Sequence, residues 1–321
     1  MVCRGGNARF AVHYQGCVRV TDFLPTAAAL VEKLPRVLRR HRLMTTWMRL
    51  TGERPVQLVR IRGTSFGYAD MDDGFLRLIP INQEFEKDFF AIADRLLEGG
   101  GVFLDVGANY GLLSFGLAGK HGAAIDFHLF EPNRTLQTSI ERTSALYPEM
   151  RLKMNAVAVS NIDGVVSFQI DQRQTGASHI VRDGGGLEVP CVTLDRYIEA
   201  ERLTSVELLK LDVEGYELPA LQGARRSLEG RIIQAVYFEY FEKWLRRVAP
   251  PSELIVFLDS VGFQVCFCRP ADYLPLGGAT HRVGSFYPGQ AVDVRPVVGH
   301  CIPLMTDLLA VPKESLRKTE H

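Results

Sequence analysis

Neither sign of charge is in excess in this 321-residue chain, because 37 Lys and Arg residues balance 37 Asp and Glu residues. A general nucleic-acid-binding protein needs a basic surface, so this balance argues against one. Long apolar runs are also missing, since none approaches the roughly 20 residues that a membrane-spanning helix needs. No signal-peptide core follows the N-terminal arginines. We therefore expect a cytoplasmic protein without a transmembrane segment.

Cysteine pairs with the spacing of a metal or redox site are absent as well. The six cysteines, at positions 3, 17, 191, 266, 268 and 301, include no Cys-x-x-Cys pair. We interpret them as free thiols in a reducing compartment. The sequence therefore predicts neither a disulfide framework nor a metal site.

The first 80 residues have no strong alternating pattern, and we predict that they form a small N-terminal extension to a main domain at 81–321. Residues 35–50 resemble a basic helix with one apolar face, and residues 63–81 alternate enough for a short hairpin. The helix could bind a membrane surface or a partner. A helix that docks on the protein with a solvated basic face is the favoured interpretation.

From residue 84 onward, helical and strand-like patterns alternate. The expected helices are 84–98, 110–119, 133–147, 194–202, 216–228 and 252–261. The expected strands are 102–106, 125–130, 152–159, 206–211, 232–239 and 263–268, with two more at 165–170 and 187–193 around a polar loop at 171–186. Apolar residues between 304 and 311 suggest that the tail returns to the core. This alternation predicts an α/β fold whose mostly parallel sheet has helices on both faces.

The segment Phe-Leu-Asp-Val-Gly-Ala-Asn-Tyr-Gly at 103–111 predicts a buried strand that turns through two glycines into a helix. Parallel α/β sheets build nucleotide-type pockets at such turns, where glycine admits a ligand close to the backbone. The middle glycine that makes room for a pyrophosphate is missing, and Asp105 at the strand end would repel phosphate. An acid there suits a positively charged ligand such as S-adenosylmethionine. We therefore predict a methyltransferase.

Two further strand ends could complete the cofactor site. Glu131 follows the second strand, where a carboxylate can accept both ribose hydroxyls of a nucleoside. Its alternative role is to cap the helix that follows. Asn155 and Ala156 end the third strand pattern and could hold an adenine edge, or be ordinary strand residues.

Candidate proton acceptors lie on the later strands and loops. Asp212 and Glu214 follow a buried strand, at the sheet edge where ligands of open α/β sheets bind, although a helix N-terminus also favours acids. An attacking hydroxyl needs a proton acceptor, so both are candidate catalytic residues. His179, in the polar loop, is a third candidate, and most lone loop histidines are simply exposed. Glu239 could line the same crevice among aromatic residues.

Together these segments resemble the FkbM-type family of S-adenosylmethionine-dependent methyltransferases over about residues 84–268. The resemblance is carried by 103–111, Phe-Glu-Pro-Asn at 130–133, Asn-Ala-Val-Ala-Val-Ser at 155–160, Val-Thr-Leu-Asp at 192–195, Leu-Leu-Lys-Leu-Asp-Val-Glu-Gly-Tyr-Glu at 208–217 and Leu-Gln-Gly-Ala at 221–224. It implies a class I methyltransferase (Rossmann-like) fold with a seven-stranded sheet, one strand of which is antiparallel. It also implies O-methylation of a hydroxyl on a sugar, glycan, polyketide or other natural-product metabolite.

By position, the resemblance assigns the methionine part of the cofactor to Asp105, Gly107, Asn109 and Gly111, and the ribose to Glu131. It does not fix the acceptor residues. Two alternatives stay open, namely a nicotinamide-dependent oxidoreductase and a binding module that kept the cofactor pocket without turnover. A methyltransferase acting on protein or nucleic-acid amino groups is less favoured, because no Asn/Asp-Pro-Pro-aromatic segment follows the fourth strand.

Overall fold

The computed structural model describes residues 56–70, 73, 85–182, 184–268, 295–296, 302 and 305–317. All of them belong to one compact unit, Arg54–His321. The helix predicted at 35–50 lies outside the described residues, as does most of the 71–81 half of the predicted hairpin.

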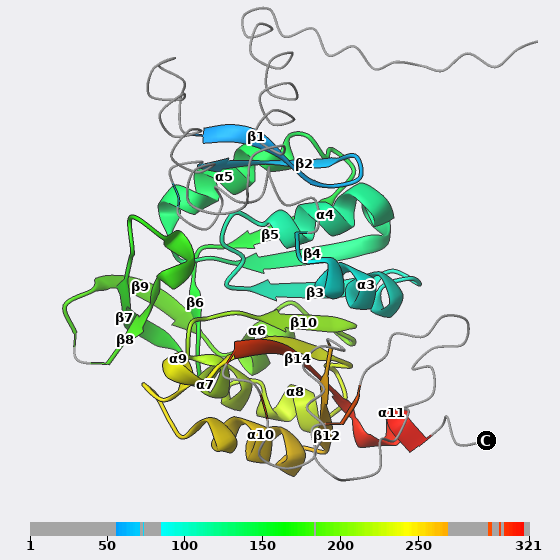
Figure 1. The fold of residues 1–321 in the computed structure, drawn as a ribbon, viewed down its shortest axis with the longest axis vertical. Helices are drawn as coiled ribbons and strands as arrows, with labels where there is room; N and C mark the ends of the chain where they lie inside the picture. Colours follow the sequence, from blue (N-terminus) through cyan, green and yellow to red (C-terminus); the bar gives the residue numbers. More distant parts are fainter. Residues whose placement is uncertain are drawn as a thin grey trace, which may run out of the picture. The chain divides into compact units, whose positions relative to one another are not determined.

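Within the described residues, one large sheet has the strand order β13-β12-β14-β11-β10-β3-β4-β5 (Figure 1). In that order the strands are Arg295–Pro296, Phe263–Phe267, Met305–Pro312, Val236–Phe241, Leu208–Leu211, Gly101–Val106, Ile125–Phe130 and Arg151–Asn155. Neighbours from β11 to β5 pair in parallel, whereas β14 is antiparallel to both β11 and β12. Apart from the two-residue β13, this is the seven-stranded sheet of a class I methyltransferase, which confirms the predicted fold.

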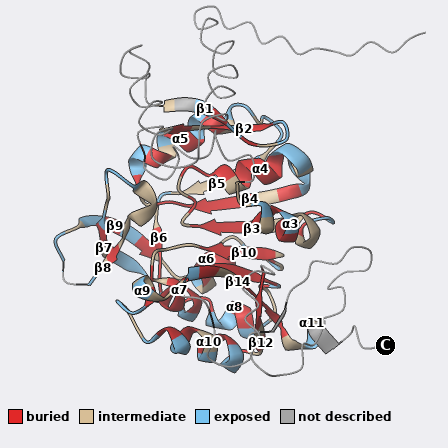
Figure 2. Ribbon diagram, in the orientation of Figure 1, coloured by how far each residue is buried: buried red, intermediate tan, exposed pale blue. Residues whose placement is uncertain are grey.

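Helices cover both faces of this sheet, and its central strands β3, β4, β10 and β11 are mostly buried, whereas the edge strand β5 is partly exposed (Figure 2). One face packs on α6 (Leu194–Ala200), α7 (Glu217–Gln222), α8 (Arg225–Glu229) and α10 (Pro251–Ser260). The other face carries Phe103, whose ring lies 6.0 Å from that of Phe89 in α3 (Lys87–Leu96). The other helices of the described residues are α4 (Leu112–His121), η2 (Gly122–Ala124), α5 (Arg134–Ser144), η3 (Thr175–Ala177), α9 (Glu242–Leu245) and α11 (Lys313–Arg317). No helix in the described part of the chain combines the length and the apolar character that a membrane crossing requires.

The N-terminal hairpin begins earlier than the alternating pattern predicted. Strands β1 (Val56–Arg62) and β2 (Ser65–Asp70) pair antiparallel around a turn at Gly63, which has a φ of 49°. The hairpin contacts α4 and α5. Tyr147, just beyond α5, binds both backbone groups of Phe66, with its hydroxyl accepting from the N–H and donating to the carbonyl at 2.7 Å each. These bonds attach the hairpin to the segment that follows α5.

A second sheet of four strands, in the order β6-β9-β7-β8, lies beside the large one. Its strands are β6 (Ala158–Val159), β7 (Gly164–Gln169), β8 (His179–Val181) and β9 (Leu187–Val192). The strand predicted at 152–159 is therefore two strands, because β5 pairs with β4 whereas β6 leaves that sheet to pair with β9. The predicted loop 171–186 also contains a strand, β8, which pairs with β7.

The helix predicted at 216–228 is interrupted at Gly223. A side chain at this position would place its Cβ 2.2 Å from the carbonyl oxygen of Ser160. Asp195 then caps the second piece, α8, since its carboxylate accepts hydrogen bonds from the N–H groups of Arg226 and Ser227. This close approach between distant segments is tertiary information, which helical periodicity does not contain.

Candidate active site

Two adjoining cavities open at the carboxyl ends of β3, β4, β10 and β11. The smaller one is lined by residues that follow β4 and β5, including Glu131, Pro132, Val157 and Ala158. The larger one has a volume of about 470 Å³, in the range of small-molecule sites, and is lined by residues of β11 and α9, including Tyr237, Glu239, Phe241 and Trp244. Both cavities are lined by Gly107, Asn109, Gly176, Asp212 and Glu214.

The glycine turn between β3 and α4 lines both cavities. Gly107 has a φ of 75°, and its N–H donates to the carbonyl of Phe130 at 3.0 Å. A Cβ at Gly107 would lie only 1.9 Å from the carbonyl oxygen of Asp212, so no other residue fits there without displacing backbone. Gly111, at a φ of 69°, directly precedes α4. The sequence analysis expected glycine to admit a ligand here; in the structure, the group that closely approaches Gly107 is the loop after β10.

Glu131 lies at the end of β4 and is buried with both carboxylate oxygens hydrogen-bonded. Oε2 accepts from the N–H of Asn109 at 2.9 Å, and Oε1 accepts from the N–H of Asn133 at 2.8 Å. Burial raises the pKa of Glu131 to about 7, although these two N–H groups lower it. Each oxygen has a second lone pair, so the carboxylate can still accept ligand hydroxyls. The helix cap itself is Asn133, whose side chain accepts from the N–H of Thr135.

Asp105 does not line either cavity, in contrast to the direct cofactor contact that we expected. It is fully buried, and its Oδ2 accepts a hydrogen bond from the Ser114 hydroxyl at 2.7 Å. Its Oδ1 lies 3.5 Å from Nζ of Lys210, so an ammonium inside the protein offsets its charge. The argument that Asp105 itself would attract a cationic ligand and repel phosphate therefore has no support in this geometry.

Asn155 and Ala156 also do not line either cavity. The Asn155 side chain donates to the carbonyl of Leu129 at 3.1 Å and to the Tyr197 hydroxyl at 3.0 Å. The next two residues, Val157 and Ala158, line the smaller cavity instead. The strand ends at Asn155, so the chain turns toward the cavity later than the pattern suggested.

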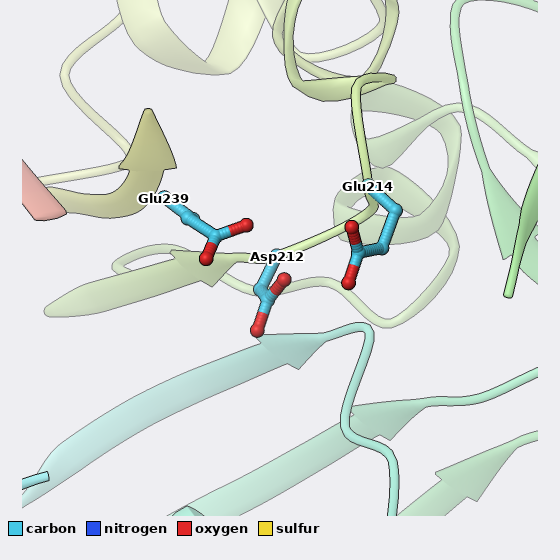
Figure 3. A group of neighbouring side chains, drawn as sticks. All are labelled: Asp212, Glu214 and Glu239. Atoms are coloured by element: carbon cyan, nitrogen blue, oxygen red, sulfur yellow. The ribbon is translucent and has the colours of Figure 1, made fainter. Parts of the chain in front are cut away.

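Three carboxylates, those of Asp212, Glu214 and Glu239, lie close together (Figure 3). Asp212 and Glu214 line both cavities, and Glu239 lines the larger one. Each offers an oxygen within 4.8 Å of the others. Burial and the charge of Asp212 raise the pKa of Glu214 to about 8 and that of Glu239 to about 9. Near neutral pH, Glu214 and Glu239 thus hold protons. Oxygens this close could also share a cation, so the sequence-based prediction of no metal site stays a prediction.

His179 lies outside both cavity linings, and its ring nitrogens are already engaged. Nδ1 lies 2.9 Å from the carbonyl oxygen of Ala177, and Nε2 lies 3.3 Å from a guanidinium nitrogen of Arg247. Because Arg247 can only donate, Nε2 is the acceptor and Nδ1 carries the proton. The Trp244 ring packs against the same imidazole. This geometry argues against the proposed role of His179 as a base and indicates that it fastens the β8 segment to α9.

The segment η3 lies over the glycine turn. Gly176 lines both cavities, and Thr175 lies beside the turn. The N–H of Thr175 donates to Asp73 at 3.2 Å, and its hydroxyl donates to the same carboxylate. The hydroxyl also lies 3.3 Å from the side-chain oxygen of Asn109. In the sequence, the polar character of residues 171–186 indicated that this loop could cover a pocket. Nothing in the sequence indicated that Asp73 would be its hydrogen-bond partner.

Known proteins resemble this chain in the part that carries the two cavities. The family model described as the methyltransferase FkbM domain matches residues 105–265, which is half of the chain. The hexuronic acid methyltransferase AglP of Haloferax volcanii is 24% identical over 144 residues, covering 45% of this chain and 58% of that protein. The alignment thus spans little more than half of the relative's length.

Among solved structures, an S-adenosylmethionine-dependent O-methyltransferase from Thermotoga maritima is similar with a TM-score of 0.36 and 13% identity, covering 82% of this chain and 80% of that one. TYW2 from M. jannaschii, solved in complex with AdoMet, has a TM-score of 0.36 and 10% identity, covering 81% and 88%. Because both scores are below 0.5, the fold assignment rests on the strand order of the sheet and not on these structures.

Proposed function

The chain belongs to the FkbM methyltransferase family, and we propose that it transfers a methyl group from S-adenosylmethionine to a hydroxyl of a sugar, glycan or natural-product metabolite. The observation that carries this proposal is the junction of the two cavities. Asp212 and Glu214 line both, so a donor in one and an acceptor in the other would meet beside these carboxylates. The reaction converts the acceptor hydroxyl into a methyl ether and leaves S-adenosylhomocysteine.

The residues of the smaller cavity fit the nucleoside part of this donor. Glu131 presents carboxylate oxygens for ribose hydroxyls, while Val157, Ala158 and Ile180 offer an apolar surface for a base. The turn at Gly107 and Asn109 leads from this cavity to the larger one. When bound, S-adenosylmethionine supplies an electrophilic methyl group on a sulfonium.

Asp212 is the residue that best fits the proton acceptor. Its Oδ2 lies 3.4 Å from the ammonium of Lys210, which stabilises its negative charge, whereas Glu214 and Glu239 hold protons near neutral pH. A carboxylate at this place can take the hydroxyl proton as the acceptor oxygen forms its new bond. Protonated Glu239 can at the same time donate a hydrogen bond to the acceptor.

The residues that line the larger cavity suit an acceptor with several hydroxyl groups. Phe241 and Trp244 present aromatic surface, and Glu239 and Asp307 present polar atoms on the same cavity. Aromatic rings usually pack against the faces of a sugar ring, and carboxylates accept hydrogen bonds from its hydroxyl groups. The name of the relative AglP, a hexuronic acid methyltransferase, supports the same class of acceptor.

Two finer predictions accompany this function. We propose the cytoplasm as the compartment, and the free thiols of Cys191, Cys266 and Cys268 agree with a reducing environment. No nucleic acid is expected as a partner, because the chain has no net charge. Contact of residues 35–50 with a membrane surface remains an alternative.

The experiment has two stages. Calorimetry first compares S-adenosylmethionine and S-adenosylhomocysteine with NADH and NADPH, and only the first two are expected to bind. Labelled methyl transfer is then measured on a panel of neutral sugars, uronic acids, oligosaccharides and polyketides, with Asp212→Asn as the inactive control. Binding of a nicotinamide cofactor in place of the methyl donor would contradict the proposal, as would transfer to amino groups alone.

A further inference from the structure

Lys210 lies at the boundary between the protein interior and the larger cavity. It is directly opposite Asp105 in the parallel pairing of β10 with β3, so the two side chains leave the sheet on the same face. Lys210 is 5% exposed and Asp105 is 0% exposed, yet Lys210 also lines the cavity. A buried lysine is rare unless its charge is paired, so its partners indicate its role.

Three oxygens surround the ammonium of Lys210. Nζ donates to the carbonyl oxygen of Gly107 at 2.9 Å and lies 3.4 Å from Oδ2 of Asp212 and 3.5 Å from Oδ1 of Asp105. Burial by itself lowers the pKa of Lys210, but the carboxylates of Asp212 and Asp105 outweigh it and raise this pKa above its ordinary value. Lys210 is therefore expected to carry its positive charge at neutral pH.

Each of these contacts has a different consequence. The contact with Asp105 offsets a buried charge, which is a structural task. The hydrogen bond to Gly107 fixes the carbonyl of the turn that lines both cavities. The contact with Asp212 holds a side chain that is 41% exposed and would otherwise be free to rotate in the cavity.

We propose that Lys210 is a positioning residue of the donor site, because it fixes the Gly107 turn and the Asp212 carboxylate before the donor binds. This inference rests on the proposed function. The ammonium of Lys210 thus links the Gly107 turn to the carboxylate of Asp212, which lines both cavities. Without it the turn loses a hydrogen bond and the negative charge of Asp212 is no longer held near the place of the sulfonium.

The test distinguishes the positioning role of Lys210 from its role as the counter-ion of Asp105. The single variant Lys210→Met leaves a buried carboxylate unpaired and can fail to fold. The double variant Asp105→Asn/Lys210→Met removes both charges, and the amide introduced in place of the carboxylate can still accept the hydrogen bond from Ser114. Its folding is checked by thermal melting and circular dichroism, and binding of S-adenosylmethionine and S-adenosylhomocysteine is measured by calorimetry.

The matched control is Glu207→Gln, at the opposite end of the same strand pair. Glu207 accepts hydrogen bonds from the N–H of Val102 and from the Ser205 hydroxyl, away from both cavities. We expect the folded double variant to bind S-adenosylhomocysteine about tenfold more weakly than the original protein, as for loss of a charge-assisted hydrogen bond. S-adenosylmethionine should lose several-fold more affinity, because its sulfonium is positively charged. The control should bind both as before.

The outcomes distinguish this inference from the proposed function. Unchanged affinities in the folded double variant would overturn the positioning role and leave Lys210 as the counter-ion of Asp105. An equal loss for both ligands would overturn the part of the proposal that concerns Asp212. If the original protein bound neither ligand, the proposed function itself would fail, and the role of Lys210 with it.

Discussion

The backbone N–H of Asn109 donates a hydrogen bond to Oε2 of Glu131 at 2.9 Å. The turn after β3 and the acid after β4 are therefore directly joined, although 21 residues separate them along the chain. Asn109 adopts a φ of 53°, a left-handed conformation that aims its N–H at this carboxylate. The position of a ligand that is hydrogen-bonded to Glu131 would thus depend on the conformation of the glycine turn as well.

Glu131→Gln should weaken binding of S-adenosylhomocysteine by about tenfold, because an amide offers one acceptor oxygen where the carboxylate offers two. Calorimetry measures the change. Glu141→Gln, on the exposed surface of α5, is the control and should bind as before. Full affinity in Glu131→Gln would show that the ribose is held elsewhere.

Gly107→Ala should abolish binding of S-adenosylhomocysteine, since its Cβ would collide with the carbonyl of Asp212. The matched control is Gly63→Ala, because Gly63 also has a positive φ, of 49°, but apart from its chain neighbours no atom of the described residues lies within 4 Å of a Cβ there. Strain alone should cost the control about 1–2 kcal/mol of unfolding free energy. Urea denaturation and calorimetry measure both variants, and equal effects at the two positions would contradict the importance of the close approach.

Asp212→Asn should lower the methyl-transfer rate by about 10²- to 10⁴-fold, as for loss of a general base. His179→Ala should change that rate by less than about twofold, because both ring nitrogens are engaged outside the cavities. The rates are measured with the best acceptor from the panel. If a stably folded His179→Ala variant were inactive, or if the Asp212→Asn variant stayed active, the assignment of Asp212 as the base would be wrong.

Stability should fall as the pH rises from about 5 to 9. Burial raises the pKa of Glu131 and Glu217 to about 7, that of Glu214 to about 8 and that of Glu239 to about 9, from an ordinary value of 4.5. The folded state then holds protons that the unfolded state has lost, so ionisation favours unfolding across this window.

Melting temperatures at constant ionic strength measure this pH dependence. His128, whose pKa burial lowers, acts in the opposite direction only below about pH 6.5. Glu239→Gln should flatten the decline above pH 7. A melting temperature that stays constant or rises between pH 6 and 9 would disagree with buried, protonated carboxyl groups.

Thr175→Val should speed dissociation of S-adenosylhomocysteine by roughly fivefold, in line with about 1 kcal/mol for one hydrogen bond. The variant keeps the shape of the side chain but loses the hydroxyl that joins η3 to Asp73. Stopped-flow measurements give the rate. The control is Ser144→Ala, which removes a hydroxyl that donates to the carbonyl of Glu141 within α5. An unchanged rate would mean that the hydroxyl does not restrain the cover of the glycine turn.

The sequence predicted the order of strands and helices well, because each periodic pattern is local. Parallel strands separated by helices place their carboxyl ends together, so the residue order alone predicts Gly107, Asn109, Glu131 and Asp212 at one sheet edge. The boundaries that failed, such as the helix broken at Gly223, depend on contact with Ser160, which is distant in sequence.

Only the tertiary structure decided which way the charged side chains face. The sequence shows that Asp105 and Asp212 end neighbouring strands, but not that Lys210 lies between them or that His179 binds Arg247. Residue order along the chain determines local conformation through backbone sterics and side-chain alternation. The ionisation and direction of a polar group depend on whatever distant elements enclose it, and that enclosure exists only once the sheet has formed.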